Sequence, residues 1–374
     1  MWELDFTCPP CMVDSLISLP EVTASDGAPY LLQLSYAMLR SHSARLAMST
    51  WKNYIRCVDR SVSFMQDTGI VCFPVLNERS ARGAMLFFQY LKGEGLAWAS
   101  LKSFRSAWKS FHQALGLPDP WVAYPGLAML TAGLQRQVST PPLPKVGLTI
   151  VMIKELVRYV HHQEPLFRKA GNHNVADVLL RDLVAVLLGF FAMRRSDELF
   201  VNKAHTHGIL MRHVVLIPSS HLSLWVQGQK TDQLGQGHAV TLAWVTGSGI
   251  QLGWWVQRLL ERLKQCDISY PSSPLFLPTI GNQGFRRVPV GQVVGKPMTF
   301  QRLFPKVFPV FERFPAMLKL FNWHSCRRGG ATHGYWSEVS TQLLAPHGGW
   351  HSEAGLKGYT SASFSQRLSV TLRM

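Results

Sequence analysis

A proline-rich stretch at residues 135–147, QRQVSTPPLPKVG, constrains the fold of this chain more than any other feature. Prolines at positions 141, 142 and 144 interrupt a helical pattern and favour an extended, semi-rigid path. The chain has 374 residues, which is longer than one ordinary domain. We therefore predict an N-terminal tail at 1–28, a helical domain at 29–138, a linker at 139–147 and a second domain at 148–374.

Two segments of the first domain have the periodicity of amphipathic helices. In residues 49–69 and again in 99–117, apolar side chains recur at intervals of three and four, which predicts one buried face on each helix. The expected inward-facing residues are Trp51, Tyr54, Ile55, Val58, Val62 and Met65 in the first segment, and Leu101, Phe104, Trp108, Phe111 and Leu115 in the second.

The second domain combines helical and strand periodicities. Helices are expected at 149–163, 174–200, 249–265, 299–314 and again toward the C-terminus. Between them, residues 212–219, 221–228 and 237–244 alternate as strands do and predict a short antiparallel sheet. The expected fold class is mainly α with a small antiparallel β-sheet.

The charge of the chain is strongly positive. Lys plus Arg outnumber Asp plus Glu by 38 to 22, which gives a formal charge of +16 although only 16% of the residues are charged. Such a field attracts polyanions. The longest apolar run, at 183–193, is too short for a bilayer that needs about 20 residues. Double-stranded DNA is therefore a better expected partner than a membrane.

Each of the two amphipathic helices also carries a row of cations. A cationic row is usually a solvated face, but two such rows with only Asp59 among them favour contact with phosphates. The proposed DNA-binding residues are Lys52, Arg56, Arg60, Lys102, Arg105 and Lys109.

The cysteines and the N-terminus indicate an intracellular protein without a metal. The six cysteines are scattered, which is typical of reduced thiols. Cys8 and Cys11 have CxxC spacing, but no second pair lies nearby to complete a zinc site. The N-terminal residues carry acids where a signal peptide carries a basic region.

Residues 324–359 concentrate groups that bind anions or transfer protons. His324 and Arg327 form an HxxR motif, Gly349 precedes Trp350, and Tyr359 follows Trp350 by nine residues. This order resembles the tyrosine recombinase family, the phage-integrase type of DNA strand-exchange enzyme. The resemblance covers about residues 150–360, and the preceding helices are similar to the core-binding domain of that family.

Two further positions of the family pattern lie upstream. Its RxxEL motif matches Arg195 with Glu198, although Arg194 is an alternative. The lysine that the family carries on a β-hairpin matches Lys230, with Lys203 as an earlier alternative. KTDQ at 230–233 and RRGGAT at 327–332 resemble recombinases of eukaryotic mobile elements of the crypton or DIRS type.

The residue types suit phosphodiester cleavage without a metal, ATP or another cofactor. Arginines bind phosphate oxygens bidentately and keep their charge, so Arg195 and Arg327 are expected to hold the phosphate. His324 adds a hydrogen bond or accepts the tyrosine proton, and the Trp350 indole donates to an oxygen. Tyr359 is the expected nucleophile, and Lys230 the expected general acid. His347 and His351 are alternatives to Trp350.

The resemblance also implies how the molecule works. It implies a C-shaped clamp around duplex DNA, a tetramer on DNA, a nuclear location, and recombination such as integration or transposition. Two alternatives remain: a type IB topoisomerase, which relaxes DNA with the same chemistry, and a domesticated DNA-binding protein without activity.

Overall fold

The computed structural model divides the chain into two compact units, Met1–Pro142 and Leu143–Met374, and each is described by itself. Lys203, Lys230 and the Cys8/Cys11 pair lie outside the described residues. The structure describes residues 48–138, 146–201, 208–227, 237–279, 284–288, 297 and 299–360.

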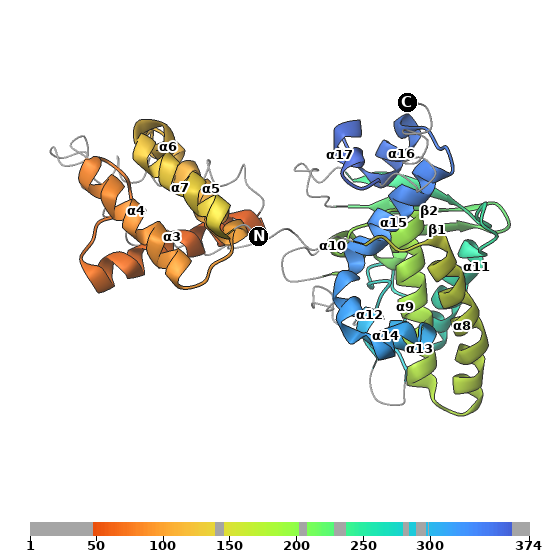
Figure 1. The fold of residues 1–374 in the computed structure, drawn as a ribbon. Helices are drawn as coiled ribbons and strands as arrows, with labels where there is room; N and C mark the ends of the chain where they lie inside the picture. Colours follow the sequence, from red (N-terminus) through yellow and green to blue (C-terminus); the bar gives the residue numbers. More distant parts are fainter. Residues whose placement is uncertain are drawn as a thin grey trace, which may run out of the picture. The chain divides into compact units, whose positions relative to one another are not determined.

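The described part of the first unit is helical, as predicted (Figure 1). Trp108 lies at its centre with no exposed surface, and its ring contacts those of Phe87 and Phe88 at centroid distances of 5.5 Å. Its indole N–H donates to Ser61 Oγ at 3.0 Å, so the only polar atom of the side chain is satisfied. The helices are α3 (Met48–Thr68), α4 (Glu78–Gly93), α5 (Trp98–Ala114), α6 (Pro120–Ala123) and α7 (Pro125–Val138).

The second unit is built around the apolar helix α9 (His173–Phe191). It packs against α8 (Ile150–Lys169), α11 (Leu252–Gln265) and α15 (Trp323–Trp336). Asp177 on α9 is fully buried and forms ion pairs with Arg168 of α8, at 3.0 Å, and Arg262 of α11, at 2.8 Å. The shorter helices are α10 (Ser196–Leu199), α12 (Thr299–Arg302), α13 (Phe304–Val307), α14 (Val310–Arg313), α16 (Thr341–Gly348) and α17 (Glu353–Lys357), with 3-10 turns at Met211–His213 and Pro315–Leu320.

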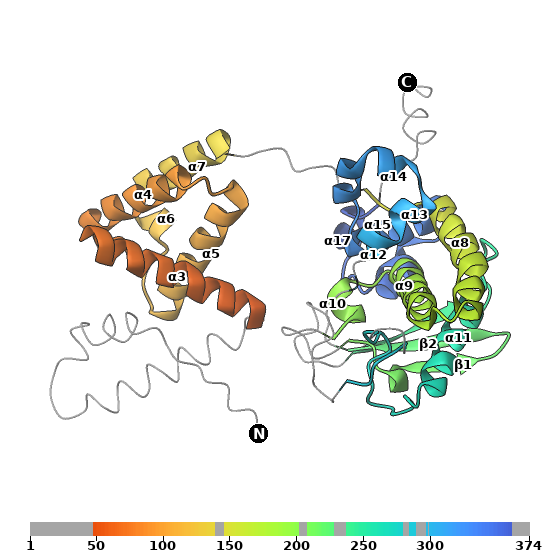
Figure 2. The same cartoon turned by 90° about the horizontal axis from the view of Figure 1, so that it is seen from below.

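The three predicted strands form an antiparallel sheet in the order β1 (Val214–Ile217), β2 (His221–Val226) and β3 (His238–Ala243). Leu224 of β2 pairs with Val240 of β3, and both side chains are buried, so one face of the sheet joins the core. The sheet lies beside α11 in both views (Figures 1 and 2).

Two helices are shorter than the sequence predicted. The helix expected at 174–200 ends at Phe191 and resumes as α10, because Met193 has a positive φ of 55° that no helix accommodates. The helix expected at 299–314 consists of three short helices instead, since Pro305 and Pro309 stand at the starts of the second and third and cannot donate the hydrogen bonds of a helix interior.

Candidate active site

The start of α15 is fixed by an N-cap and by two glycines. Asn322 accepts a hydrogen bond from the His324 N–H at 2.8 Å. A Cβ on Gly329 would lie 2.2 Å from the Leu148 carbonyl oxygen, and one on Gly330 would lie 1.9 Å from the Phe190 carbonyl oxygen. Only glycine permits so close an approach. Gly329 therefore lets α15 approach the segment before α8, and Gly330 lets it pack tightly against the end of α9, where Arg327 lies.

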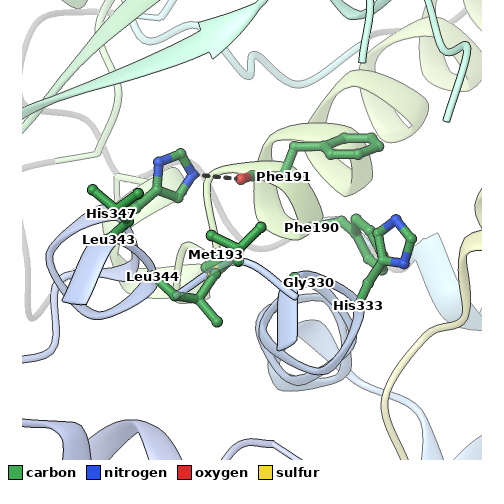
Figure 3. Close-up of a pocket in the computed structure, with 10 residues that line it drawn as sticks. Phe190, Phe191, Met193, Gly330, His333, Leu343, Leu344 and His347 are labelled. Atoms are coloured by element: carbon green, nitrogen blue, oxygen red, sulfur yellow. Dashed lines mark hydrogen bonds between the residues drawn. The ribbon is translucent and has the colours of Figure 1, made fainter. Parts of the chain in front are cut away.

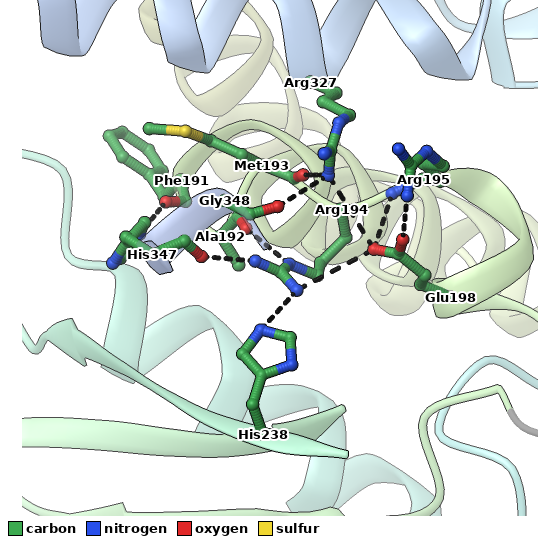
Figure 4. Close-up of polar contacts among 10 residues, drawn as sticks. All are labelled: Phe191, Ala192, Met193, Arg194, Arg195, Glu198, His238, Arg327, His347 and Gly348. Carbon is green, nitrogen blue, oxygen red and sulfur yellow. Dashed lines mark hydrogen bonds and ion pairs between the residues drawn. The ribbon is translucent and has the colours of Figure 1, made fainter. Parts of the chain in front are cut away.

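Arg327 is a buried cation with unused donors. Its Nη1 donates to the carbonyl oxygens of Met193 and Gly348 and lies 3.9 Å from Glu198 Oε2 (Figure 4). Its Nε and Nη2 are buried and have no hydrogen-bond partner in the described part of the chain. Burial lowers the pKa of Arg327 to about 10, with Glu198 acting against it and Arg195 and Arg194 in the same direction. The guanidinium is therefore still charged at neutral pH.

Trp350 stacks on this guanidinium. Arg327 Cζ lies 3.9 Å from the ring centroid. Gly349 ends α16 in the left-handed region, with φ 72°, and turns the chain so that the indole folds back over Gly348, where a Cβ would lie 1.7 Å from the ring. The indole Nε1 is buried and, among the described residues, has no hydrogen-bond partner. A third unused donor therefore lies beside those of Arg327.

Tyr359 joins this group from the segment after α17. Its half-buried ring lies 5.0 Å from the Trp350 ring and 5.1 Å from the His324 ring, between centroids, and 5.2 Å from Arg327 Cζ. Thr332 Oγ1 of α15 donates to the Tyr359 carbonyl at 3.1 Å. The structure thus brings together the four predicted residues His324, Arg327, Trp350 and Tyr359.

Arg194 and Arg195 lie in the break between α9 and α10 and differ in their burial and in their hydrogen-bond partners. Arg194 is fully buried, and it donates to the carbonyl oxygens of Ala192 and His347 and contacts His238 Nε2 at 2.9 Å (Figure 4). Burial lowers the pKa of Arg194 to about 10. This side chain therefore connects three segments inside the protein.

Arg195 is more accessible. Its side chain is 22% exposed, and its Nη1 lies 2.9 Å from Glu198 Oε1. Glu198 is the shared neighbour of this guanidinium and of Arg327, so both lie close to one carboxylate. The sequence-based choice of Arg195 used helix phase, which does not apply in the break. Its accessibility supports the same choice, whereas Glu198 does not distinguish the two arginines, because Arg194 Nη1 also lies 3.8 Å from Glu198 Oε2.

His347 and His351, the alternatives to Trp350, differ from it in their surroundings. The His347 Nε2 contacts the Phe191 carbonyl oxygen at 2.8 Å, and burial lowers the pKa of His347. His351 is exposed. The sequence did not suggest His238, the partner of Arg194, because nothing in its strand distinguishes it from other residues.

An apolar cavity of about 230 Å³ lies beside this group, between α9, α15 and α16. Figure 3 shows Phe190, Met193 and Leu344 around it, with His347 bonded to Phe191. Met193 lines the cavity with its side chain and accepts from Arg327 with its carbonyl. The position of Arg327 therefore depends on apolar packing as well as on hydrogen bonds.

The six proposed DNA-binding cations differ in their neighbours. Lys52 and Arg56 of α3 and Lys102 of α5 are exposed. Arg60 lies 3.8 Å from Glu94, and Lys109 lies 2.7 Å from Asp119. Arg105 stands over the Trp121 ring, at 5.4 Å from its centroid. Acids outside the two helices therefore neutralise part of the charge, in addition to Asp59.

In the part of the chain that the structure describes, no group of three or more His, Cys, Asp and Glu side chains is arranged to hold a metal ion. None of the helices described there is long and apolar enough to cross a membrane.

Comparisons with known proteins bear on the fold. No protein family model and no curated protein matches the chain. The structure of the XerH site-specific recombinase bound to a palindromic difH substrate, a post-cleavage complex, matches with a TM-score of 0.53 and 13% identity, over 96% of this chain and 92% of that chain. A Tn1549 transposon integrase complex with right-end DNA has a TM-score of 0.49 at 15% identity, covering 91% and 98% of the two chains. A lambda integrase dimer bound to a COC′ core site has 0.48 at 13%, covering 88% and 94%.

The first of these matches defines the class of fold. The XerH structure shares the mainly helical architecture with its small antiparallel sheet, so the predicted fold class is confirmed.

Proposed function

We propose that this protein is a tyrosine recombinase, which cuts and rejoins DNA through a 3′-phosphotyrosyl intermediate. The observation that carries the proposal is the set of three buried, unused donors beside Tyr359, namely Nε and Nη2 of Arg327 and Nε1 of Trp350. Each buried donor without a partner costs about 1–3 kcal/mol. An anion with several oxygens, such as a phosphodiester, would satisfy all three.

The chemistry follows from the positions of these residues. Tyr359 Oη attacks phosphorus and forms the P–O bond as the bond to the 5′ oxygen breaks. Arg327 and Arg195 neutralise the charge that develops on the non-bridging oxygens, and Trp350 donates to one of them. His324 lies 5.1 Å from Tyr359 between ring centroids and takes up the tyrosine proton. Attack by the 5′ hydroxyl of a second strand reverses the sequence without an added energy source.

Lys230 is proposed as the acid that protonates the departing 5′ oxygen. The residue lies outside the described part of the chain, so this role rests on the resemblance to the family and on the place of Lys230 in the sequence between β2 and β3. No cofactor takes part in the proposed reaction.

The proposed DNA contacts involve both units. We infer that the units close around duplex DNA as a C-shaped clamp, with Lys52, Arg56 and Lys102 on phosphates. The XerH protein was captured on a palindromic substrate. For this chain we propose paired sites, a tetramer on DNA, a nuclear location and a relationship to mobile elements of the crypton or DIRS type.

A suicide-substrate assay tests the proposal. Nicked duplexes with the terminal sequences of the protein's own element are incubated with wild type and with Tyr359→Phe, and the products are separated on a denaturing gel. The expected result is a covalent protein–DNA band that forms without metal and is absent in the variant.

The same assay, with a plasmid-relaxation assay beside it, separates the alternatives. Joined products from two duplexes indicate a recombinase, whereas relaxation of supercoiled plasmid without joined products indicates a type IB topoisomerase. Retarded DNA without a covalent band for any substrate would contradict both and indicate a DNA-binding protein without activity.

A further inference from the structure

A second cavity lies away from Tyr359, between α8 and the start of α11. Its volume is about 530 Å³, within the range of small-molecule sites. Its lining includes Lys154, Arg158 and His161 of α8, Ser248 and Gln251 of the turn before α11, and Trp254 of α11.

Aromatic rings form one wall of this cavity. Trp254 is 37% exposed, whereas its neighbour Trp255 is only 2% exposed and anchors it in a perpendicular arrangement at a centroid distance of 4.7 Å. Arg258 stands over the Trp254 ring at 5.3 Å and is itself ion-paired with the buried Glu164. The His161 ring lies 6.1 Å from that of Trp254. The exposed indole is therefore held in place and offers a surface on which a flat ring can stack.

Two cations of α8 also line the cavity. Lys154 and Arg158 lie one turn apart on the face of α8 that carries His161, and both are exposed. Arg158 is paired with Glu155, and Lys154 has no ion pair in the described part of the chain. No acid is among the described residues that line the cavity, although Glu155 beside it offsets the charge of Arg158. Lys154 therefore leaves a positive charge at the cavity that favours an anion.

We propose that this cavity binds a nucleoside phosphate, with its base on Trp254 and its phosphates on Lys154 and Arg158. Ser248 and Gln251 supply hydrogen-bonding groups for the sugar or the base edge. A duplex is too wide to enter such a cavity, whereas a single nucleotide is of suitable size. The site is separate from Arg327, Trp350 and Tyr359, so the proposal does not depend on DNA cleavage.

Binding would link α8 and α11, which both pack against the buried helix α9. A ligand that binds only the folded protein raises its stability in proportion to the logarithm of ligand concentration. Thermal unfolding therefore provides a readout that needs neither DNA nor activity.

The test uses the full chain and titrates ADP, adenosine and inorganic pyrophosphate separately, by calorimetry and thermal unfolding. ADP is expected to bind saturably and to raise the melting temperature. Adenosine and pyrophosphate are each expected to bind at least about ten-fold more weakly, because each lacks one of the two contacts. Equal affinity for pyrophosphate and ADP, or no saturable binding of ADP, would overturn the proposal.

Matched variants locate the site. Trp254→Leu and Lys154→Gln are expected to weaken ADP binding by about ten-fold or more. The controls are Trp336→Leu, at an indole that is 45% exposed on α15, and Lys169→Gln, at an exposed lysine of α8 outside the cavity. Affinities that fall equally in variants and controls would place the nucleotide elsewhere.

Discussion

Arg194 and Arg195 are neighbours in sequence but differ in what their guanidinium groups can reach. Both lie beside Glu198, but Arg194 is buried among the Ala192 and His347 carbonyl oxygens and His238, whereas Arg195 is partly exposed. A lysine in place of an arginine has a single nitrogen and cannot span several acceptors in one plane. The two positions should therefore respond differently to the same substitution.

We expect Arg195→Lys to reduce the rate of covalent complex formation by about a hundred-fold, the effect of removing one oxyanion donor, with little change in melting temperature. Arg194→Lys should instead lower the melting temperature by several degrees, because buried hydrogen bonds are lost. Thermal unfolding and the suicide-substrate assay measure both effects. The reverse pattern would assign the phosphate contact to Arg194.

The spacing of residues was sufficient to select His324, Arg327, Trp350 and Tyr359, which the structure brings together. It did not predict that Arg327 is held by the carbonyl oxygens of Met193 and Gly348, because every residue carries such a group and only the fold selects two of them. His238 was missed for the same reason.

At the scale of elements, the packing of α15 on α9 depends on Gly330. We expect Gly330→Ala to destabilise the protein by about 1–3 kcal/mol, because its Cβ would collide with the Phe190 carbonyl, and to slow cleavage by displacing Arg327. Gly133→Ala in α7 is the control, since a Cβ there meets nothing within 4 Å. It should be neutral or stabilising by about 0.5–1 kcal/mol. Chemical denaturation and the cleavage assay are the measurements, and unchanged stability in Gly330→Ala would contradict the close packing.

His112 of α5 should make the stability of the first unit depend on pH. Its Nε2 accepts from the Val75 N–H at 3.1 Å and its Nδ1 contacts the Pro118 carbonyl oxygen at 3.0 Å, an arrangement that requires the neutral ring. Burial lowers the pKa of His112 from 6.5 to about 4. The unfolded chain therefore binds a proton between pH 6.5 and 4 that the folded chain does not, and the free energy of unfolding falls by about 3 kcal/mol over that window.

Urea denaturation of the full chain at pH 7 and pH 4.5 checks this prediction. His112→Gln should be less stable than wild type at pH 7, and the difference should narrow at pH 4.5. His161→Gln, at an exposed position, should keep the pH dependence of wild type. Parallel pH profiles for wild type and His112→Gln would show that another group is responsible.

Periodicity predicted the elements well where the pattern was long, as for α5, α8 and the three paired strands. It did not predict the break after α9, because neither glycine nor proline marks the positive φ of Met193. The breaks at Pro305 and Pro309 were predictable from the prolines themselves. The sequence-based prediction followed the apolar periodicity of 299–314 instead and gave one continuous helix.

At the scale of the whole molecule, the positive charge should appear in the salt dependence of DNA binding. We expect Lys52→Gln and Arg56→Gln each to reduce the slope of log K against log salt by about 0.9, because each contact with a phosphate releases a counterion. Lys109→Gln should have a smaller effect, since Asp119 lies 2.7 Å from its amine. Fluorescence anisotropy with a duplex at several salt concentrations gives the slopes. Slopes of the Lys52→Gln and Arg56→Gln variants equal to that of wild type would exclude α3 from the interface.

The proline-rich segment and the length indicated two units, and the structure divides the chain at Pro142 within that segment. The neutralising roles of Glu94 and Asp119 were not predictable, because they arise where α3 and α5 meet residues outside their own helices.

A ribosome releases the helices that carry Lys52, Arg56 and Lys102 long before it releases Gly348, Trp350 and Tyr359. Until residue 348 emerges, Arg327 has only one of the two carbonyl partners that hold it. On the proposed function, a growing chain would therefore carry its DNA-binding cations before the cleavage site around Tyr359 is complete.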